Sequence, residues 1–427
     1  MDFEQASGPF SRRRVLAAGT AGNVVEWYDF ALYGYLAPIT AGLFFPSSDP
    51  LVSLLNTYAV FALGFLTRPL GGLIFGHIGD RFGRRQLITL SVVMMAVPTF
   101  LTGMLPTYAS VGILAPVLLT GLRLIQGISA GGEFSGSIIL LVEHAPPNQR
   151  GLYGSIANFG AMIGALLGVG MGWLLTAFLP ADVTYDWGWR IPFLTSIIIG
   201  ALGLWIRLGI PDTPTYTRLK DSGTLEHHPL RAALRRHGRE MMLTAGLNWV
   251  VSAGYYVVFV WFVTDMTSVL GLPYHLALGV GTIGLLFGLI ATPAFGYLSD
   301  RIGGRRMLAI GSVATAVFAI PLLMIASTGT VIAATVVQLG LALLIAIFLG
   351  TLPAVFVSFY RAEMRCTALS LGYNVALALF GGTAPLVATL LIKLTGWSSA
   401  PGLYLAATAL ACLALIRFVP KPEPEML

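Results

Sequence analysis

The segment GNVVEWYDFALYGY (22–35) places two carboxylates inside an apolar run that extends from residue 15 to residue 45. Asn23, Glu26, Asp29 and Tyr33 are spaced three, three and four residues apart, so a helix would carry all four on one face. A carboxylate at the centre of a membrane span costs about 2.5–3.5 kcal/mol on insertion scales, so each acid should face a polar cavity or a cation. The pattern indicates a path for ions or protons, and the alternative is an ion pair that only locks helices together.

Two other apolar segments contain arginines that could meet these acids. Arg123 lies near the middle of the segment 112–141, and Glu133 is about 15 Å further along the same segment, too far away to neutralise it. We therefore expect Arg123 to face one of the two acids across a helix bundle, or to bind the carboxylate of a solute in bidentate fashion. For Arg68, which precedes a proline nearer the end of its segment, we expect a structural role.

Proton coupling needs a side chain that changes its protonation state, and the six histidines lie in or beside expected loops. Asp29, Glu26 and Glu133 are therefore the expected proton-coupling residues. If an anionic solute occupied the neighbouring arginine, the acid would lose its counter-ion and take up a proton more readily. No nucleophile–histidine pair, metal-ligand cluster or GxxxxGK[ST] loop is present, so we expect no catalytic residue, no metal and no cofactor besides a proton gradient.

Further polar side chains interrupt the apolar segments and could line a solute path. In the second half of the chain, Asn248 and Tyr255 share one face of a segment, with Ser252 between them. The alternative for each is a hydrogen bond that joins two helices. The expected solute-binding residues are Arg123, Asn23, Tyr33, Gln126, Asn158, Asn248, Tyr255 and Asn374.

Such side chains must be positioned by membrane-spanning helices. The chain has 427 residues, of which 56% are hydrophobic and only 10% charged, and its mean hydropathy is +0.81. Continuous apolar runs of about 20 residues indicate helices rather than the alternation of a membrane barrel. We expect twelve spans, near 15–45, 53–77, 86–105, 112–141, 152–179, 190–210, 240–266, 275–298, 307–327, 331–358, 368–395 and 400–419. An even number of spans with basic short loops puts both termini in the cytoplasm, and the first span lacks the features of a cleaved signal peptide.

An internal repeat divides these spans into two groups of six. GHIGDRFGRR (76–85) follows the second span, and GYLSDRIGGRR (296–306) follows the eighth, with matching positions 220 residues apart. The longest polar stretch separates the two copies. The sequence therefore predicts a bundle at 1–210, a central cytoplasmic loop at 211–239 and a second bundle at 240–427.

These motifs carry a family resemblance. The repeated loop resembles that of the major facilitator superfamily, and GNVVEWYDF, GFLTRPLGG, GLRLIQGISAGGE, WGWRIPF and FGGTAPL together resemble the metabolite:proton symporter family. The resemblance implies the major facilitator fold and a cytoplasmic latch between the halves. The implied latch residues are Gly76, Asp80, Arg81, Gly83, Arg84, Asp300 and Arg301. The second copy has Gly304 where the first has Arg84, so a symmetric latch is not expected.

The expected function is proton-coupled uptake of a small organic acid, such as a di- or tricarboxylate, by alternating access. The family resembled includes carriers of citrate, 2-oxoglutarate, shikimate and proline/betaine, so a zwitterionic solute is the first alternative. A drug:proton antiporter and a scaffold that transports nothing are the others. The short tail PKPEPEML argues against an osmosensing carrier. The expected setting is a monomer in the bacterial inner membrane that binds a small molecule and no nucleic acid.

Overall fold

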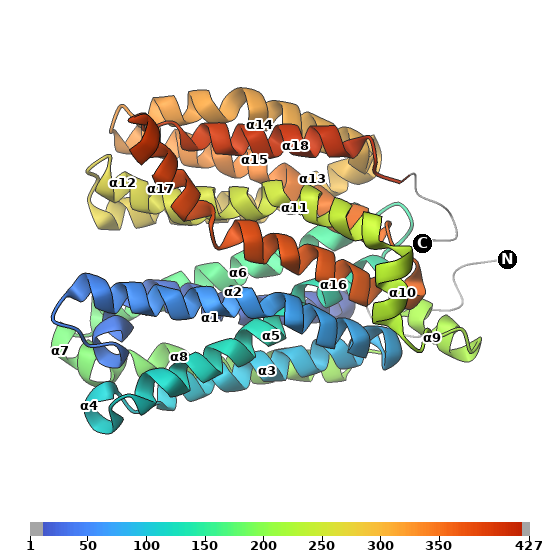
Figure 1. Cartoon of the computed structure of the whole chain (residues 1–427), viewed down its shortest axis with the longest axis horizontal. Helices are drawn as coiled ribbons and strands as arrows, with labels where there is room; N and C mark the ends of the chain where they lie inside the picture. Colours follow the sequence, from blue (N-terminus) through green and yellow to red (C-terminus); the bar gives the residue numbers. More distant parts are fainter. Residues whose placement is uncertain (1–11, 421–427) are drawn as a thin grey trace.

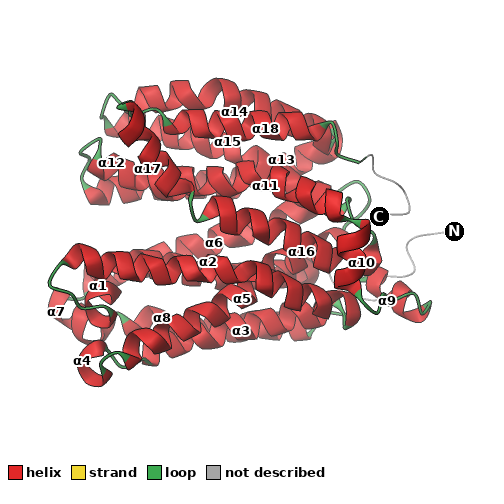
Figure 2. Cartoon of the chain, viewed as in Figure 1, coloured by secondary structure: helices red, strands yellow, loops and turns green. Residues whose placement is uncertain are grey.

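The computed structural model describes residues 12–420, and all regular secondary structure in that range is helical (Figure 2). The helices form two bundles that lie side by side along their lengths (Figure 1). The first bundle contains α1 (Arg12–Phe44), α2 (Pro50–Arg81), α3 (Arg84–Met104), α4 (Tyr108–Val111), α5 (Leu114–Glu143), α6 (Arg150–Phe178), α7 (Ala181–Val183), the π-helical turn η1 (Thr184–Gly188) and α8 (Arg190–Leu208).

Two short helices, α9 (Pro214–Asp221) and α10 (Pro229–Arg236), connect this bundle to the second. The second bundle contains α11 (Gly238–Tyr256), η2 (Val257–Trp261), α12 (Phe262–Ser268), α13 (Tyr274–Ile302), α14 (Gly304–Ala326), α15 (Val331–Val357), η3 (Ala362–Met364), α16 (Arg365–Ala376), η4 (Leu377–Gly381), α17 (Ala384–Thr395) and α18 (Pro401–Ile416). Here η2 and η4 are π-helical turns and η3 is a 3₁₀ turn.

The expected twelve-span helical fold is confirmed. Ten described segments of 21–34 residues are long and apolar enough to cross a membrane. The other two crossings are α1, with 33 residues, and the shorter α18, with 16. Each of the seventh and eleventh crossings is one path built from two α-helices joined by a π-helical turn.

The second bundle contains two of the π-helical turns, η2 in the seventh crossing and η4 in the eleventh, and neither is evident from the continuous apolar runs that contain them. A π-helical turn displaces backbone carbonyls from the regular hydrogen-bond pattern, and a polar side chain bonds to one carbonyl oxygen of η2. Gln338 donates to the Val258 carbonyl oxygen of η2 (3.3 Å), and Asn248 donates to the carbonyl oxygen of Tyr373, just before η4 (3.3 Å).

Glycines allow α1 and α6 to approach closely. Gly160, Gly164, Gly168 and Gly172 recur every four residues on α6, and a Cβ atom at any of them would collide with α1. At Gly164 the obstacle includes the Val24 carbonyl oxygen, which cannot move aside as a flexible side chain could. This stripe therefore holds α1, the helix with the two acids, at a fixed distance from α6.

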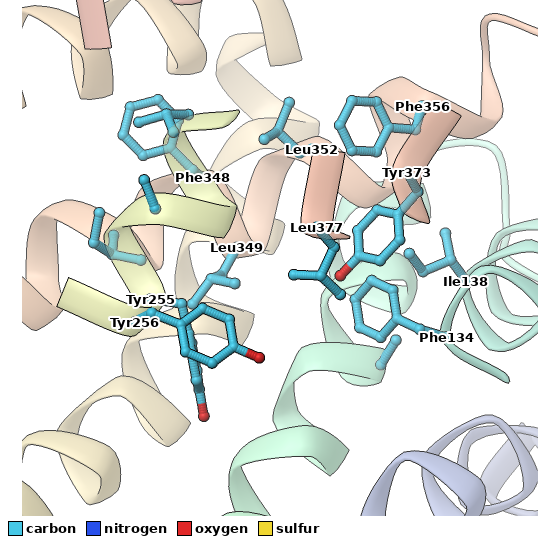
Figure 3. Packing of buried hydrophobic residues seen from close by; sticks show 14 of the residues in the cluster. Phe134, Ile138, Tyr255, Tyr256, Phe348, Leu349, Leu352, Phe356, Tyr373 and Leu377 are labelled. Atoms are coloured by element: carbon cyan, nitrogen blue, oxygen red, sulfur yellow. The ribbon is translucent and has the colours of Figure 1, made fainter. Parts of the chain in front are cut away.

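The bundles meet in a shared apolar core near their middle. Figure 3 shows Phe134 and Ile138 of α5 opposite Tyr373 and Leu377 of the second bundle, with Phe356 nearby. The rings of Phe134 and Tyr373 stack with their centroids 4.8 Å apart. We call the end of the molecule where α1 begins and α18 ends the basic end; α9 and α10 also lie there (Figure 1).

Candidate functional site

Three acid–arginine pairs are buried within the first bundle. Glu26 of α1 meets Arg68 of α2 at 2.8 Å, and Asp29 of α1 meets Arg123 of α5 at 2.7 Å. Glu133 of α5 meets an arginine of α8, and each of the six side chains is at most 2% exposed. Breaking a buried pair by removing one partner typically costs about 3–5 kcal/mol, so all three pairs constrain the bundle.

The Asp29 carboxylate has a complete set of partners. It accepts hydrogen bonds from the Thr99 hydroxyl (2.9 Å), Gln126 Nε2 (2.9 Å) and two nitrogens of Arg123 (2.7 and 3.4 Å). The Arg123 guanidinium also lies over the ring of Tyr33, 3.8 Å from its centroid. All of these partners belong to the first bundle. The sequence placed Arg123 opposite the acids of α1, and the structure pairs it with Asp29 rather than with Glu26.

Glu133 is equally well satisfied. Its carboxylate accepts hydrogen bonds from Ser91 Oγ (2.5 Å), Ser137 Oγ (2.9 Å) and two guanidinium nitrogens of Arg207, which also donates to the Ala18 and Ile88 carbonyl oxygens.

The sequence analysis did not identify Arg207 as the partner of Glu133, although the sequence contains a feature that could have indicated it. Arg207 is the only charged residue between Arg190 and Asp212, and an isolated arginine in an apolar run requires an anion.

The Glu26–Arg68 pair is incomplete. One nitrogen of Arg68 donates to Glu26 Oε1 at 2.8 Å, whereas Glu26 Oε2 and Arg68 Nε are buried without a hydrogen-bond partner among the described residues. The guanidinium lies over two rings, 4.6 Å from the Phe30 centroid and 5.0 Å from the Phe65 centroid. A buried carboxylate oxygen without a partner is costly, and Glu26 is the one acid of the three pairs that keeps such an oxygen, so this pair is well prepared to bind a further polar group.

This incomplete pair lies beside the second bundle. The Phe65 ring packs on Tyr256 of α11 with centroids 5.7 Å apart, and the Trp27 ring packs on Tyr255 at 4.8 Å. An ion pair from one bundle and aromatic side chains from the other thus meet at the interface.

Two of the amides expected to bind solute form hydrogen bonds between the two bundles. Asn158 of α6 donates to the Leu349 carbonyl oxygen (2.8 Å), and Asn374 of α16 donates to the Gly131 carbonyl oxygen (2.6 Å). The side-chain oxygens of Asn23, Asn248 and Asn374 are buried without a described partner.

Of the two tyrosines in the same prediction, one lies at the interface. The Tyr33 hydroxyl donates to the Thr57 carbonyl oxygen within the first bundle (3.0 Å), whereas Tyr255 faces Trp27 across the interface.

At the basic end, two aspartates bind helix N-termini across the interface. Asp80 of α2 accepts hydrogen bonds from the backbone N–H groups of Cys366 (3.0 Å) and Thr367 (2.8 Å) in α16. Asp300 of α13 accepts them from the N–H groups of Gly151 (2.6 Å) and Leu152 (2.9 Å) in α6. The expectation of an asymmetric contact was therefore wrong for the aspartates, because each caps a helix whose N–H groups carry partial positive charge.

The two copies of the loop motif differ in the contacts of their arginines. Arg84 donates to the Ala362 carbonyl oxygen across the interface (2.6 Å) and lies 3.6 Å from Glu143, which also pairs with Arg365 of α16 at 2.7 Å. Arg81 and Arg301, both expected in this latch, are exposed. Arg81 lies over the ring of Phe82, which directly follows α2, and Arg301 lies over the ring of Tyr297 in α13.

Glycines of the motif permit these contacts. Gly76 lies against the Thr367 backbone with no room for a Cβ atom, and Gly83 has φ 113°, which an L side chain rarely adopts. A Cβ atom at Gly83 would also collide with the Asp212 carboxylate.

Asp212 connects the central loop to this region. Its Oδ1 accepts hydrogen bonds from the Arg84 N–H (3.0 Å) and the Thr213 N–H (2.9 Å). Burial raises the pKa of the Asp212 carboxyl above its usual range, while the Thr213 N–H and the Arg84 guanidinium oppose the shift. Tyr216 of α9 donates to the Arg81 carbonyl oxygen at 3.1 Å, so α9 is held against the latch.

Two helical bundles with buried ion pairs at their interface and reciprocal contacts at one end define a polytopic membrane carrier. The family model described as Major Facilitator Superfamily matches residues 19–376 and 246–427. The chain belongs to the major facilitator superfamily, and it is a membrane transporter rather than an enzyme.

Relatives with different named solutes are similar over most of the chain. The proline/betaine transporter of Salmonella typhimurium is 34% identical over 82% of this chain and 72% of its own length. The shikimate transporter of Escherichia coli is 37% identical over 74% and 73%, and the alpha-ketoglutarate permease of Escherichia coli is 35% identical over 73% and 72%. The structure of the proton:xylose symporter XylE bound to 6-bromo-6-deoxy-D-glucose has a TM-score of 0.81 at 18% identity, covering 96% of both chains, which shows the shared fold.

Proposed function

We propose that this transporter takes up a small carboxylate-bearing solute together with protons, by alternating access across a bacterial inner membrane, with the basic end in the cytoplasm. Proline, betaine, shikimate and 2-oxoglutarate, the solutes named for the relatives, have a carboxylate in common. The basic short loops support the orientation, by the preference of Lys and Arg for the cytoplasmic side.

The observation that carries the proposal is the incomplete Glu26–Arg68 pair at the interface. A solute carboxylate would bind the free edge of the Arg68 guanidinium, where Nε has no partner. Glu26 would then share its counter-ion with the solute and hold a proton more readily, so solute and proton would bind together.

This assignment differs in part from the one drawn from the sequence, which put the solute on Arg123 and the coupling on Asp29, Glu26 and Glu133. The carboxylate oxygens of Asp29 and Glu133 all have partners within the first bundle, whereas Glu26 Oε2 has none among the described residues. Arg123 Nε, like Arg68 Nε, is without such a partner, so the free carboxylate oxygen is what distinguishes the Glu26–Arg68 pair. We propose that the Asp29 and Glu133 clusters orient α1, α5 and α8.

The closed contacts at the basic end fit alternating access. The contacts of Asp80 and Asp300 hold the two bundles together at the basic end. Release of the solute at that end would therefore require both helix caps to open. Both caps are short-range contacts between rigid helices, which suits a rocking motion of one bundle against the other.

A zwitterionic solute is favoured as the second candidate by the aromatic side chains. Trp27 and Tyr255 stack edge to face, and Tyr256 packs beside them. Aromatic rings at the interface suit a cationic amine, whereas Arg68 suits a carboxylate. A solute with both groups would satisfy both halves of the pair, and an organic acid would satisfy only Arg68.

Transport by purified protein in proteoliposomes tests the proposal. With an imposed pH gradient, radiolabelled proline, glycine betaine, shikimate and 2-oxoglutarate are compared, and at least one should accumulate. Arg68→Lys should weaken the half-saturation for that solute roughly 10- to 100-fold, because a charge-assisted bidentate contact is lost. Glu26→Gln should abolish accumulation driven by the gradient while solute exchange persists.

Arg123→Lys is the matched comparison, because it makes the same chemical change in a buried pair of the same bundle. We expect it to affect stability more than half-saturation. If Arg123→Lys loses solute affinity and Arg68→Lys keeps it, the solute site belongs to Arg123 and the present assignment fails.

A further inference from the structure

Two amide side chains at the interface between the bundles keep an oxygen that can accept a hydrogen bond. The side-chain oxygens of Asn248 in α11 and Asn374 in α16 are buried without a hydrogen-bond partner among the described residues. Both amides have a fixed orientation, because their nitrogens donate to backbone carbonyl oxygens, Asn248 to that of Tyr373 (3.3 Å) and Asn374 to that of Gly131 (2.6 Å). The two oxygens therefore remain as acceptors for a donor that the described protein does not supply.

Contacts between the helices place both amides beside α2, the helix that carries Arg68. Asn374 bonds to Gly131, and a Cβ atom at Gly131 would collide with the Arg68 carbonyl oxygen. Asn248 reaches the same region because it bonds to Tyr373, the neighbour of Asn374 in the chain. The unpaired amide oxygens of the second bundle thus lie next to the helix that bears half of the incomplete ion pair.

An aromatic residue of the first bundle adds an unpaired donor. The indole N–H of Trp27, the residue that follows Glu26, is buried without a hydrogen-bond partner in the described part of the chain. Its ring packs on Tyr255 of the second bundle, with centroids 4.8 Å apart. Figure 3 shows the hydroxyl groups of Tyr255 and Tyr256 pointing away from α11. A buried indole N–H usually finds an acceptor, so an acceptor is required here as well.

This mixture of acceptors and donors restricts the chemistry of the solute. Glu26 Oε2 and the two amide oxygens need donors, whereas Arg68 Nε and Trp27 Nε1 need acceptors. A carboxylate supplies acceptors only, and a quaternary ammonium group has no hydrogen to donate, so a betaine or a keto acid would leave the amide oxygens unpaired. A hydroxyl group both donates and accepts, so a solute with hydroxyl groups can satisfy both kinds of partner.

A protonated amine also donates, but it fits the amide oxygens less well. Its positive charge favours the Glu26 carboxylate, because hydrogen bonds between charged groups are the stronger ones. The uncharged oxygens of Asn248 and Asn374 would then keep no partner, whereas a neutral hydroxyl group is matched to them.

We propose that the solute is a hydroxylated carboxylic acid, with its carboxylate on Arg68 and its hydroxyl groups bonded to Asn248 and Asn374, while Trp27 donates to its remaining oxygens. This inference rests on the proposed function and narrows the class of solute bound at the same site. A site that hydrogen-bonds a hydroxyl group rejects the analogue without it, because the buried polar groups of the site are then left unpaired.

Pairs of acids that differ only in hydroxyl groups test the inference. In proteoliposomes with an imposed pH gradient, uptake and mutual competition are measured for shikimate and cyclohexenecarboxylate, malate and succinate, and gluconate and hexanoate. Proline and glycine betaine are measured beside them. In at least one pair the hydroxylated acid should have a half-saturation roughly 100-fold lower than its partner, because two hydrogen bonds to buried groups distinguish them.

Variants identify the groups that recognise the hydroxyls. Asn248→Leu should weaken the half-saturation for the hydroxylated acid roughly tenfold and leave that for its partner unchanged. Trp27→Phe keeps an aromatic ring against Tyr255 but removes the N–H, and it should also weaken binding of the hydroxylated acid. Trp205→Phe is the matched control, since the Trp205 side chain is 69% exposed on α8, and it should change neither acid.

The outcomes separate this inference from the proposed function. Proton-driven uptake with equal half-saturation for both members of every pair would overturn the inference and leave the proposed function standing. A preference for proline over all the hydroxylated acids would assign the free acceptors to an amine, and a preference for glycine betaine would show that they receive no donor; either overturns the inference. An equal loss of both acids in Asn248→Leu would make Asn248 structural and remove it from the site. Accumulation of no carboxylate at all would overturn the proposed function itself.

Discussion

Replacing Asp80 with asparagine tests whether the helix caps hold the basic end closed. In the structure, the carboxylate accepts N–H groups of Cys366 and Thr367 at 3.0 and 2.8 Å, and it is fully buried. Asparagine has the same shape but only one acceptor oxygen and no charge. One N–H loses its partner, and the other exchanges a charge-assisted bond for a neutral one.

The expected size follows from these two losses. A hydrogen bond to a charged group contributes about 1.5–3 kcal/mol and a neutral one about 0.5–1.5 kcal/mol, and a carboxylate at a helix N-terminus adds up to about 1 kcal/mol. The closed conformation should therefore weaken by about 2.5–5 kcal/mol relative to the open one. That change corresponds to roughly 70- to 5000-fold in the equilibrium between them.

Accessibility of a residue deep in the interface measures this change. Ser135 of α5 is 1% exposed and makes a 2.5 Å hydrogen bond with Ser370 of α16. With Cys366 and Cys412 replaced by alanine, a Ser135→Cys variant is labelled with a water-soluble maleimide. The rate should rise in Asp80→Asn, and the exposed Asp221→Asn should leave it unchanged. Equal labelling rates with and without Asp80 would refute the capping role.

Three further results are expected. Cysteines at both Ser135 and Ser370 should form a disulfide that stops transport until a reductant is added; transport by the fully oxidised protein would contradict the need for the interface to part. Gly22→Ala should lower the thermal unfolding midpoint strongly, because its Cβ would collide with the Glu133 carboxylate, whereas Gly34→Ala on the same helix has open space and should not. Glu133→Gln should cost about 3–5 kcal/mol of stability yet leave the proton-to-solute ratio unchanged in reversal-potential measurements, and a changed ratio would restore Glu133 to the coupling site.

Much of the architecture followed from local patterns. Runs of apolar residues define membrane spans because the bilayer excludes unpaired backbone groups, and the 220-residue offset between the repeated loops identifies the two halves. The spacing of Glu26 and Asp29 correctly placed both acids on α1. In the structure, Gly76 and Asp80 lie against α16 of the second bundle, and Gly83 lies against Asp212 and Tyr216.

Partner choice among the buried charges did not follow from the sequence. Adjacent acids on α1 go to different helices, since Glu26 meets Arg68 of α2 and Asp29 meets Arg123 of α5. Glu26 and Asp29 are three residues apart, so their side chains lie about 60° apart around the helix axis. This spacing alone allowed each acid to face either α2 or α5.

The physical reason is that the pattern of hydrophobic residues says little about how a membrane-spanning helix is rotated about its own axis. In a soluble bundle the polar face of a helix points to water, but here lipid and core are both apolar, so the rotation of each helix leaves no clear trace in the sequence. The sequence determined the helices, their order, their repeat and the charges each one carries. Only the packing of α1 against α2, α5 and α6 decided that Asp29 is fully bonded and that Glu26 keeps a free oxygen at the interface.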